Sequence, residues 1–140
     1  MIYEGLGFPI EISNAPIKEI LGDPVLDIDL NWLQATVFRL LLESKGRFSG
    51  AQVRFVRHSM ELTQARFADL LALSNHSAVS QWETRGDALA GMDRSVEILL
   101  RLQMAKHIGD EVMLRRWLDE RLARECIGPL VFRWCLATAS

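Results

Sequence analysis

The sequence predicts a mainly α-helical protein with a small β-containing N-terminal segment, a central helix-turn-helix and a C-terminal helix. After residue 29, apolar residues recur every three to four positions over most of the chain, which is typical of amphipathic helices. Glycine and proline interrupt residues 2–28 at short intervals, as they do between short strands. Residues 62–83 have the pattern of two short helices joined by a tight turn.

Length and composition are those of a folded protein that needs no disulfide or metal support. The chain has 140 residues, of which 49% are hydrophobic and 24% are charged. The chain has only two cysteines, Cys126 and Cys135, whereas small disulfide-rich secreted proteins have more. We therefore expect reduced thiols and a cytoplasmic protein. No apolar run approaches the ~20 residues that cross a bilayer, and residues 1–5 do not begin a signal peptide, so no membrane contact is expected.

The N-terminal segment is predicted to contain short strands. Residues 8–12 alternate apolar and polar side chains, as a half-buried strand does. Residues 14–16 are typical of a turn, and residues 17–21 and 25–28 are candidates for two further strands. We expect this segment to end near Asp29, where the helical pattern begins.

Two helices are expected before the helix-turn-helix. The first begins after Asp29, a suitable N-cap, and ends near residue 44. The second covers about 50–60 and carries Arg54 and Arg57 on its outer side. The expected buried face of the first helix consists of large apolar residues at helical spacing, namely Leu30, Leu33, Val37, Leu40 and Leu41, widened by Trp32 and Phe38.

The helix-turn-helix has recognisable ends. Thr63 and Asn75 are suitable N-caps for helices over residues 64–71 and 76–84. Gly86 follows the second helix at the position where a left-handed residue commonly ends a helix. These end signals predict a short turn between the two helices.

The two helices of this motif cross at a steep angle and need a small residue at the contact. Ala68 is suitable for the crossing position, and Val79 is expected to face back into the core. Four other apolar side chains are expected to fill the space around them: Phe67, Leu70, Leu71 and Trp82.

Two longer helices and an apolar tail complete the predicted elements. Asp93 is a suitable cap for a helix that ends near residue 108. The last helix covers about 110–126, and residues 130–134 are predicted to form a short apolar strand. These elements divide the chain into three segments: 1–46 for partner or dimer contacts, 47–108 for the helix-turn-helix domain, and 109–140 for dimerisation.

The C-terminal segment is rich in large apolar side chains. Such a surplus commonly marks a partner surface, so we expect a homodimer here. The alternative is that these residues cover the helix over 30–44. The residues concerned are Trp117, Leu118, Leu122, Val131, Phe132 and Trp134.

A helix-turn-helix usually lays its second helix in the major groove of double-stranded DNA. Serine, histidine and glutamine near the start of that helix can bond base edges, and arginine or a helix N-terminus can hold phosphate. Glu83 is expected to pair with Arg54 or Arg57. The predicted phosphate contacts are Arg54, Arg57, Thr63, Gln64 and Arg85, and the predicted base contacts are His76, Ser77, Ser80 and Gln81; Asn75, the N-cap of the second helix, is also expected at the DNA-binding site.

Charge is distributed unevenly along the chain. The formal net charge is -2, yet residues 44–66 contain five basic residues and one acidic residue. Residues 1–46 contain seven acidic and three basic residues, so this third is expected to face away from DNA. Because local potential governs phosphate contact, a basic surplus beside the motif is compatible with DNA binding.

The motif resembles the signature of the Xre/Cro-type helix-turn-helix regulators. The matching residues are Leu62-Thr63-Gln64, Phe67-Ala68, Leu71, Val79-Ser80, Trp82-Glu83 and Gly86, within a resemblance that covers about 50–104. The resemblance implies a five-helix DNA-binding domain that acts as a dimer, usually as a repressor. Two features depart from the signature: Ala72 replaces the usual glycine of the turn, and the turn is one residue longer.

Residues 3–12 and 49–57 are similar to the zinc-finger antitoxins of the MqsA type. That family has Cys-x-x-Cys-Gly where this chain has residues 18–22, which include no cysteine or histidine. A tetrahedral zinc site needs four nitrogen or sulfur ligands, so we expect no metal and no cofactor. The apolar side chains expected to hold this segment together instead are Ile17, Ile20, Leu21 and Val25.

The sequence therefore predicts a sequence-specific, dimeric DNA-binding regulator, typically a repressor. The alternative is an antitoxin-like interaction module that uses its helix-turn-helix fold, together with the N-terminal segment, to bind a toxin or another protein. An enzyme is not expected, because the sequence has no Cys–His pair, no phosphate-binding glycine loop and no cluster of metal ligands.

Overall fold

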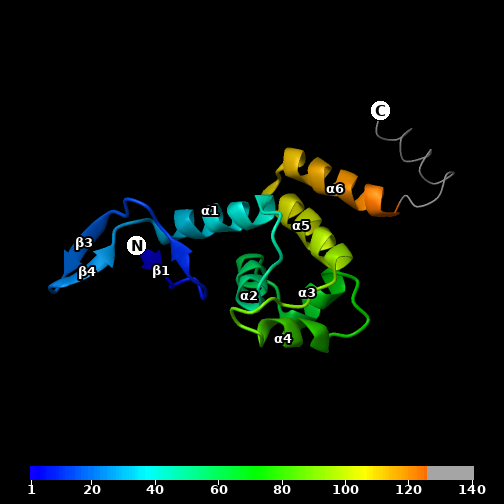
Figure 1. Cartoon of the computed structure of the whole chain (residues 1–140), viewed down its shortest axis with the longest axis horizontal. Helices are drawn as coiled ribbons and strands as arrows, with labels where there is room; N and C mark the ends of the chain where they lie inside the picture. The colour runs from blue at the N-terminus through cyan, green and yellow to red at the C-terminus, as the bar shows by residue number, and fades with distance from the viewer. Residues whose placement is uncertain (126–140) are drawn as a thin grey trace.

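A computed structural model describes residues 1–125, which form six helices and two small antiparallel sheets (Figure 1). The mainly α fold class is thereby confirmed. The resemblance implied a domain of five helices, whereas the described part of the chain has six. None of these helices is long and apolar enough to cross a bilayer.

The N-terminal segment forms two separate two-stranded sheets. Strand β1 (Ile2–Tyr3) pairs with β2 (Ile10–Glu11), and β3 (Ile17–Ile20) pairs with β4 (Asp23–Leu26). The β3–β4 turn contains only Leu21 and Gly22, and both have positive φ angles, as a tight hairpin turn requires. The hairpin projects from the N-terminal end of α1, on the side away from α3 and α4 (Figure 1).

The expectation that apolar residues hold the hairpin together is wrong. Ile17, Ile20, Leu21 and Val25 are 54%, 48%, 99% and 37% exposed. The physical reason is that a two-stranded sheet needs a third layer to bury one of its faces. Apart from their own pairing, β3 and β4 make no extensive contact with another described helix or strand.

Helix α1 (Leu30–Glu43) begins at Asp29, whose side chain accepts the Asn31 N–H. Its buried face differs from the predicted one: Leu30, Trp32 and Leu40 are exposed. Phe38 and its neighbours contact α2 and α5 instead, so the buried face is rotated relative to the expected stripe. The buried residues of α1 are Leu33, Val37, Phe38, Leu41 and Leu42.

Helix α2 (Gly50–Ser59) begins with a capping box in which Ser49 and Gln52 satisfy each other's backbone N–H groups. Val53 and Val56, on the inner face of this helix, are fully buried. A Cβ atom at Gly50 would lie 2.2 Å from the Trp82 carbonyl oxygen, so glycine permits the close approach of α2 to the end of α4.

Helices α5 (Arg94–Ile108) and α6 (Glu111–Glu125) pack side by side (Figure 1). Trp117 of α6 is fully buried, and its indole N–H donates to the Leu42 carbonyl of α1 at 3.0 Å. The prediction that Trp117 belongs to a dimer surface is therefore wrong, and the alternative covering role is confirmed for this residue. Leu118 is 44% exposed. The predictions on Cys126, Val131, Phe132, Trp134, Cys135 and the strand over 130–134 lie outside the described residues.

A buried charge cluster, which sequence periodicity did not predict, joins α5 to the α1–α2 connection. Arg101 is fully buried and donates to the Glu97 carboxylate at 2.8 Å and to the Gly46 carbonyl at 2.7 Å. Its guanidinium lies 4.2 Å from the ring centre of Phe48 and 4.9 Å from that of Trp117. Burial lowers the pKa of Arg101, and the hydrogen bond to Glu97 opposes that shift.

Candidate nucleic-acid interface

The helix-turn-helix consists of α3 (Gln64–Leu70) and α4 (Ser77–Glu83), which lie together on the side of the molecule opposite α6 (Figure 1). Ala68 and Val79 are fully buried, so the expected crossing residues are confirmed as core residues. Trp82 is 9% exposed and anchors the end of α4. Burial of this face directs the opposite, polar face of α4 outward.

The turn between the helices contains a left-handed residue that is not glycine. Ala72 has a φ angle of 55°, and the following N–H, of Leu73, donates to the Ala68 carbonyl at 2.9 Å. This is the position at which the resemblance led us to expect glycine. An alanine there carries a steric penalty that glycine would avoid.

The start of α4 lies one residue later than expected. Asn75 Oδ1 accepts hydrogen bonds from the Ser77 N–H at 3.0 Å and the Ser77 hydroxyl at 2.6 Å, so Asn75 and Ser77 are bonded to each other. His76 Nε2 lies 2.9 Å from an oxygen of the exposed Asp69 carboxylate on α3. Asn75 and His76, both predicted at the DNA-binding site, thus make contacts within the protein, and His76 occupies the N-cap position expected for Asn75.

Arg57 and Glu83 form a nearly buried, two-bond ion pair between α2 and α4, with distances of 2.7 and 3.0 Å. Arg57 also donates to the Leu62 carbonyl at 2.9 Å. Of the two partners expected for Glu83, the structure thus selects Arg57. The guanidinium predicted to contact phosphate is occupied inside the protein, and Arg57 holds α4 in place instead.

The polar side chains predicted to contact DNA come from three helices. Gln64 Nε2 lies 3.4 Å from Glu83 Oε1, and Thr63 Oγ1 accepts the Arg66 N–H as an N-cap. Gln81 is exposed on the outer face of α4. An open hollow of about 230 Å³ is lined by four residues predicted to contact DNA, namely Arg54, Arg57, Gln64 and Ser80. Glu83 and Thr84, which were not predicted to contact DNA, complete its lining.

Three arginines on or next to the helices of this region have no ion-pair partner within residues 1–125: Arg54 of α2, Arg66 of α3 and Arg85 after α4. All three are exposed. Arg66 was absent from the predicted site, although its place in the first turn after the Thr63 cap is a signal that could have identified it. Arg85 lies against Gly91, where its guanidinium limits the space for a side chain.

The described residues contain no group of three or more His, Cys, Asp or Glu side chains that could hold a metal ion. The arrangement is instead a set of uncharged hydrogen-bonding groups on and beside α4, with the Arg57–Glu83 ion pair and Arg54 at the small hollow and the exposed Asp69 carboxylate near the start of α4. Comparison of the chain with protein-family models, with curated proteins and with solved structures finds no match.

Proposed function

We propose that this protein binds double-stranded DNA by placing α4 in the major groove, and that it acts as a sequence-specific regulator, typically a repressor. The observation that carries the proposal is the outward polar face of α4, together with three exposed arginines of α2, α3 and the residues after α4 that have no ion-pair partners among residues 1–125. Uncharged side chains can read base edges, whereas arginines at the border can hold phosphates.

Each group has a distinct role in this proposal. Gln81 can form a bidentate pair with adenine, and Ser77 and Ser80 can bond several base edges. Arg54 and Arg66 hold phosphates on either side of the groove. The ion pair formed by Arg57 and Glu83 has a positioning role, since it fixes α4 relative to α2.

Selection of bound fragments from random DNA, followed by affinity measurements across salt concentrations, tests the proposal. We expect log affinity to fall linearly with log salt, and Arg66→Gln to reduce that slope by about 0.9. Gln81→Ala should weaken binding to the selected site by about 1–3 kcal/mol while leaving non-specific affinity nearly unchanged. Glu43→Gln, at an exposed position at the end of α1 that lines no part of the hollow with Arg54, Gln64 and Ser80, serves as the control. Affinity that is flat in salt would contradict the proposal.

A homodimer belongs to the same proposal. Helix α4 has seven residues and is therefore about 10 Å long, enough to read only one half-site. A two-fold dimer would contact two half-sites ~34 Å apart, one turn of DNA. Recovery of an inverted repeat with that spacing supports the dimer, and sedimentation that shows only monomers on the selected DNA contradicts it.

A second candidate function is a protein-interaction role like that of an antitoxin, and the exposed β3–β4 hairpin favours it. An isolated two-stranded hairpin is only marginally stable in water, so a partner that covers its apolar side chains would stabilise it. Residues 1–29 contain six acidic residues and one basic residue, so the partner should be basic.

Affinity capture with the full chain, followed by reconstitution from purified components, tests this second function. We expect a basic protein that binds at a fixed stoichiometry and loses at least about tenfold affinity with Leu21→Asp. The same substitution should leave DNA affinity unchanged, because the hairpin lies away from α4. Failure of every captured protein to rebind after purification would contradict the interaction role.

A further inference from the structure

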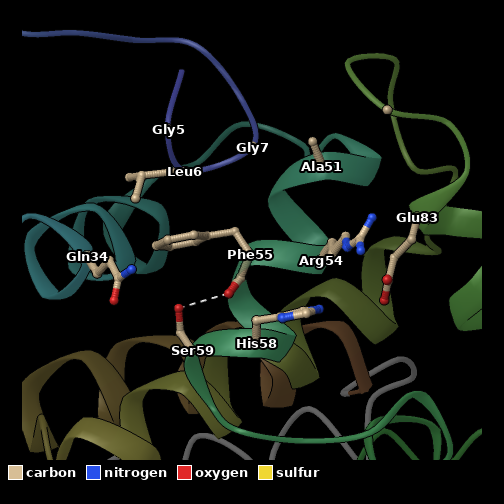
Figure 2. A pocket seen from close by; sticks show the side chains of 11 residues that line it. Gly5, Leu6, Gly7, Gln34, Ala51, Arg54, Phe55, His58, Ser59 and Glu83 are labelled. Atoms are coloured by element: carbon tan, nitrogen blue, oxygen red, sulfur yellow. Dashed lines mark hydrogen bonds between the residues drawn. The ribbon is translucent and has the colours of Figure 1, made fainter. Parts of the chain in front are cut away.

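A second hollow, of about 420 Å³, lies beside the proposed DNA-binding surface and shares Arg54 and Glu83 with the smaller hollow there (Figure 2). The N-terminal residues Gly5–Gly7 form one wall of it, and α2 forms another. Phe55 lies between Gln34 on one side and Arg54 on the other (Figure 2). Its ring packs edge-on against Phe8 at 5.4 Å, so the hollow has a rigid apolar floor.

The polar groups of this hollow favour an anion. Arg54 has no ion-pair partner, and the Gln34 amide has no hydrogen-bond partner, within residues 1–125. His58 Nε2 lies 3.0 Å from Arg57 Nη2, which can only donate, so the hydrogen of a neutral His58 is carried by Nδ1. The carboxylate on the wall, that of Glu83, is already neutralised by the two hydrogen bonds from Arg57.

We propose that this hollow binds a small organic anion, with a carboxylate or phosphate on Arg54 and an apolar body against Phe55. Donors from Arg54, Gln34 and His58 suit several oxygen acceptors, and a hollow of about 420 Å³ has room for a compact ligand. Arginine matches either anionic group in a bidentate manner.

The position of Arg54 makes this site regulatory, an inference that rests on the proposed DNA binding. Arg54 lines both this hollow and the smaller one next to Gln64 and Ser80 on the DNA-binding surface. A guanidinium engaged by a ligand anion is lost to a DNA phosphate. Ligand and DNA therefore weaken each other's binding by the same factor.

Phenyl phosphate is a suitable test compound, because it combines a phosphate with an aromatic body, and benzyl alcohol is its neutral counterpart. Titration of the full-length protein without DNA, followed by NMR at constant ionic strength, should show saturable shifts centred on the amides of Leu6, Phe55 and His58. Arg54→Gln should weaken binding at least about tenfold, whereas Arg66→Gln, an exposed arginine outside the hollow, should not. Equal shifts around all exposed arginines, or equal binding of benzyl alcohol, would overturn the site.

The coupling between ligand binding and DNA binding is tested by a separate measurement. Fluorescence anisotropy should show that the protein binds the selected DNA several-fold more weakly in saturating phenyl phosphate than without it. Arg54→Gln should bring this ratio of the two affinities to about one, whereas Arg66→Gln should leave the ratio as in the wild-type protein. An unchanged ratio in the wild-type protein would overturn the coupling. Saturable phenyl phosphate binding by a protein that does not bind DNA would refute the proposed function and leave the anion site standing.

Discussion

A single ion pair fixes the orientation of the outward helix of the helix-turn-helix. Arg57 and Glu83 are 11% and 7% exposed, and their two hydrogen bonds connect α2 to α4. The third bond, to the Leu62 carbonyl, adds the α2–α3 connection to the same network. Because both charges are largely removed from water, each depends on the other for compensation.

Removal of one partner should therefore destabilise the protein more than removal of both. Arg57→Met leaves the Glu83 carboxylate nearly buried without a counterion, and we expect a loss of about 3 kcal/mol in the free energy of unfolding. The double variant Arg57→Met/Glu83→Leu should recover most of that loss. Urea denaturation of the three proteins provides the comparison, and a single-variant loss below about 1 kcal/mol would show that the pair is well solvated.

The turn residue Ala72 offers a second test at this scale. Its φ angle of 55° is unfavourable for any residue with a Cβ atom and ordinary for glycine. Ala72→Gly should raise the free energy of unfolding by about 0.5–1 kcal/mol, and Ala72→Val should lower it. Ala65→Gly is the contrasting control, because this exposed position inside α3 should lose stability by about the same amount. If both glycine variants lost free energy of unfolding, the inference that Ala72 strains the turn would be wrong.

At the scale of elements, the contact between α3 and α4 determines which face of α4 points outward. Both helices have seven residues and are too short to be stable alone, so their packing supplies their stability. The local sequence predicted this pair well, since the Thr63 cap and the spacing from Ala68 to Val79 are signals within the motif itself. It left open whether Glu83 pairs with Arg54 or with Arg57, and only the packing of α2 against α4 decides for Arg57.

The crossing should tolerate no larger side chain at Ala68. Ala68→Leu adds three carbon atoms at a fully buried contact, and we expect a loss of about 1–3 kcal/mol in stability. Ala65→Leu on the same helix is exposed and should change stability by less than about 0.5 kcal/mol. Thermal and urea unfolding of both variants test the contrast, and equal effects would mean that Ala68 is not at the crossing.

At the scale of the whole molecule, one core extends from Phe8 to Trp117 and includes residues of all three segments defined from the sequence. The Glu97 carboxylate lies within it and faces three guanidinium groups, those of Arg47, Arg94 and Arg101. Arg94 also pairs with Glu120 of α6 at 3.5 Å. This cluster connects the α1–α2 connection, α5 and α6.

Neutralisation of Glu97 should have a global effect. Glu97→Gln leaves the fully buried Arg101 without its counterion, and a loss of about 3–5 kcal/mol is expected. Glu43→Gln, an exposed position on α1, should be nearly neutral. Hydrogen exchange should show faster opening of α1, α5 and α6 together in Glu97→Gln. A loss confined to α5 would argue against the connecting role.

The sequence by itself determined where most helices begin and end and which residues form the helix-turn-helix crossing. Caps such as Asp29 and Thr63, and the small residue Ala68, act within one or two turns of chain, so neighbouring residues suffice to interpret them. The same local patterns placed Arg54, Gln64 and Ser80 on the candidate site, and the structure brings these three around one hollow.

Only the tertiary structure decided which apolar and charged side chains are buried. Leu40 follows the helical period yet is exposed, whereas the charged Arg101 is enclosed between the rings of Phe48 and Trp117. The hairpin tip at Leu21 is exposed for the same reason, since no described element packs on it. Burial depends on what distant segments place opposite each side chain, and periodicity along one helix or strand does not contain that information.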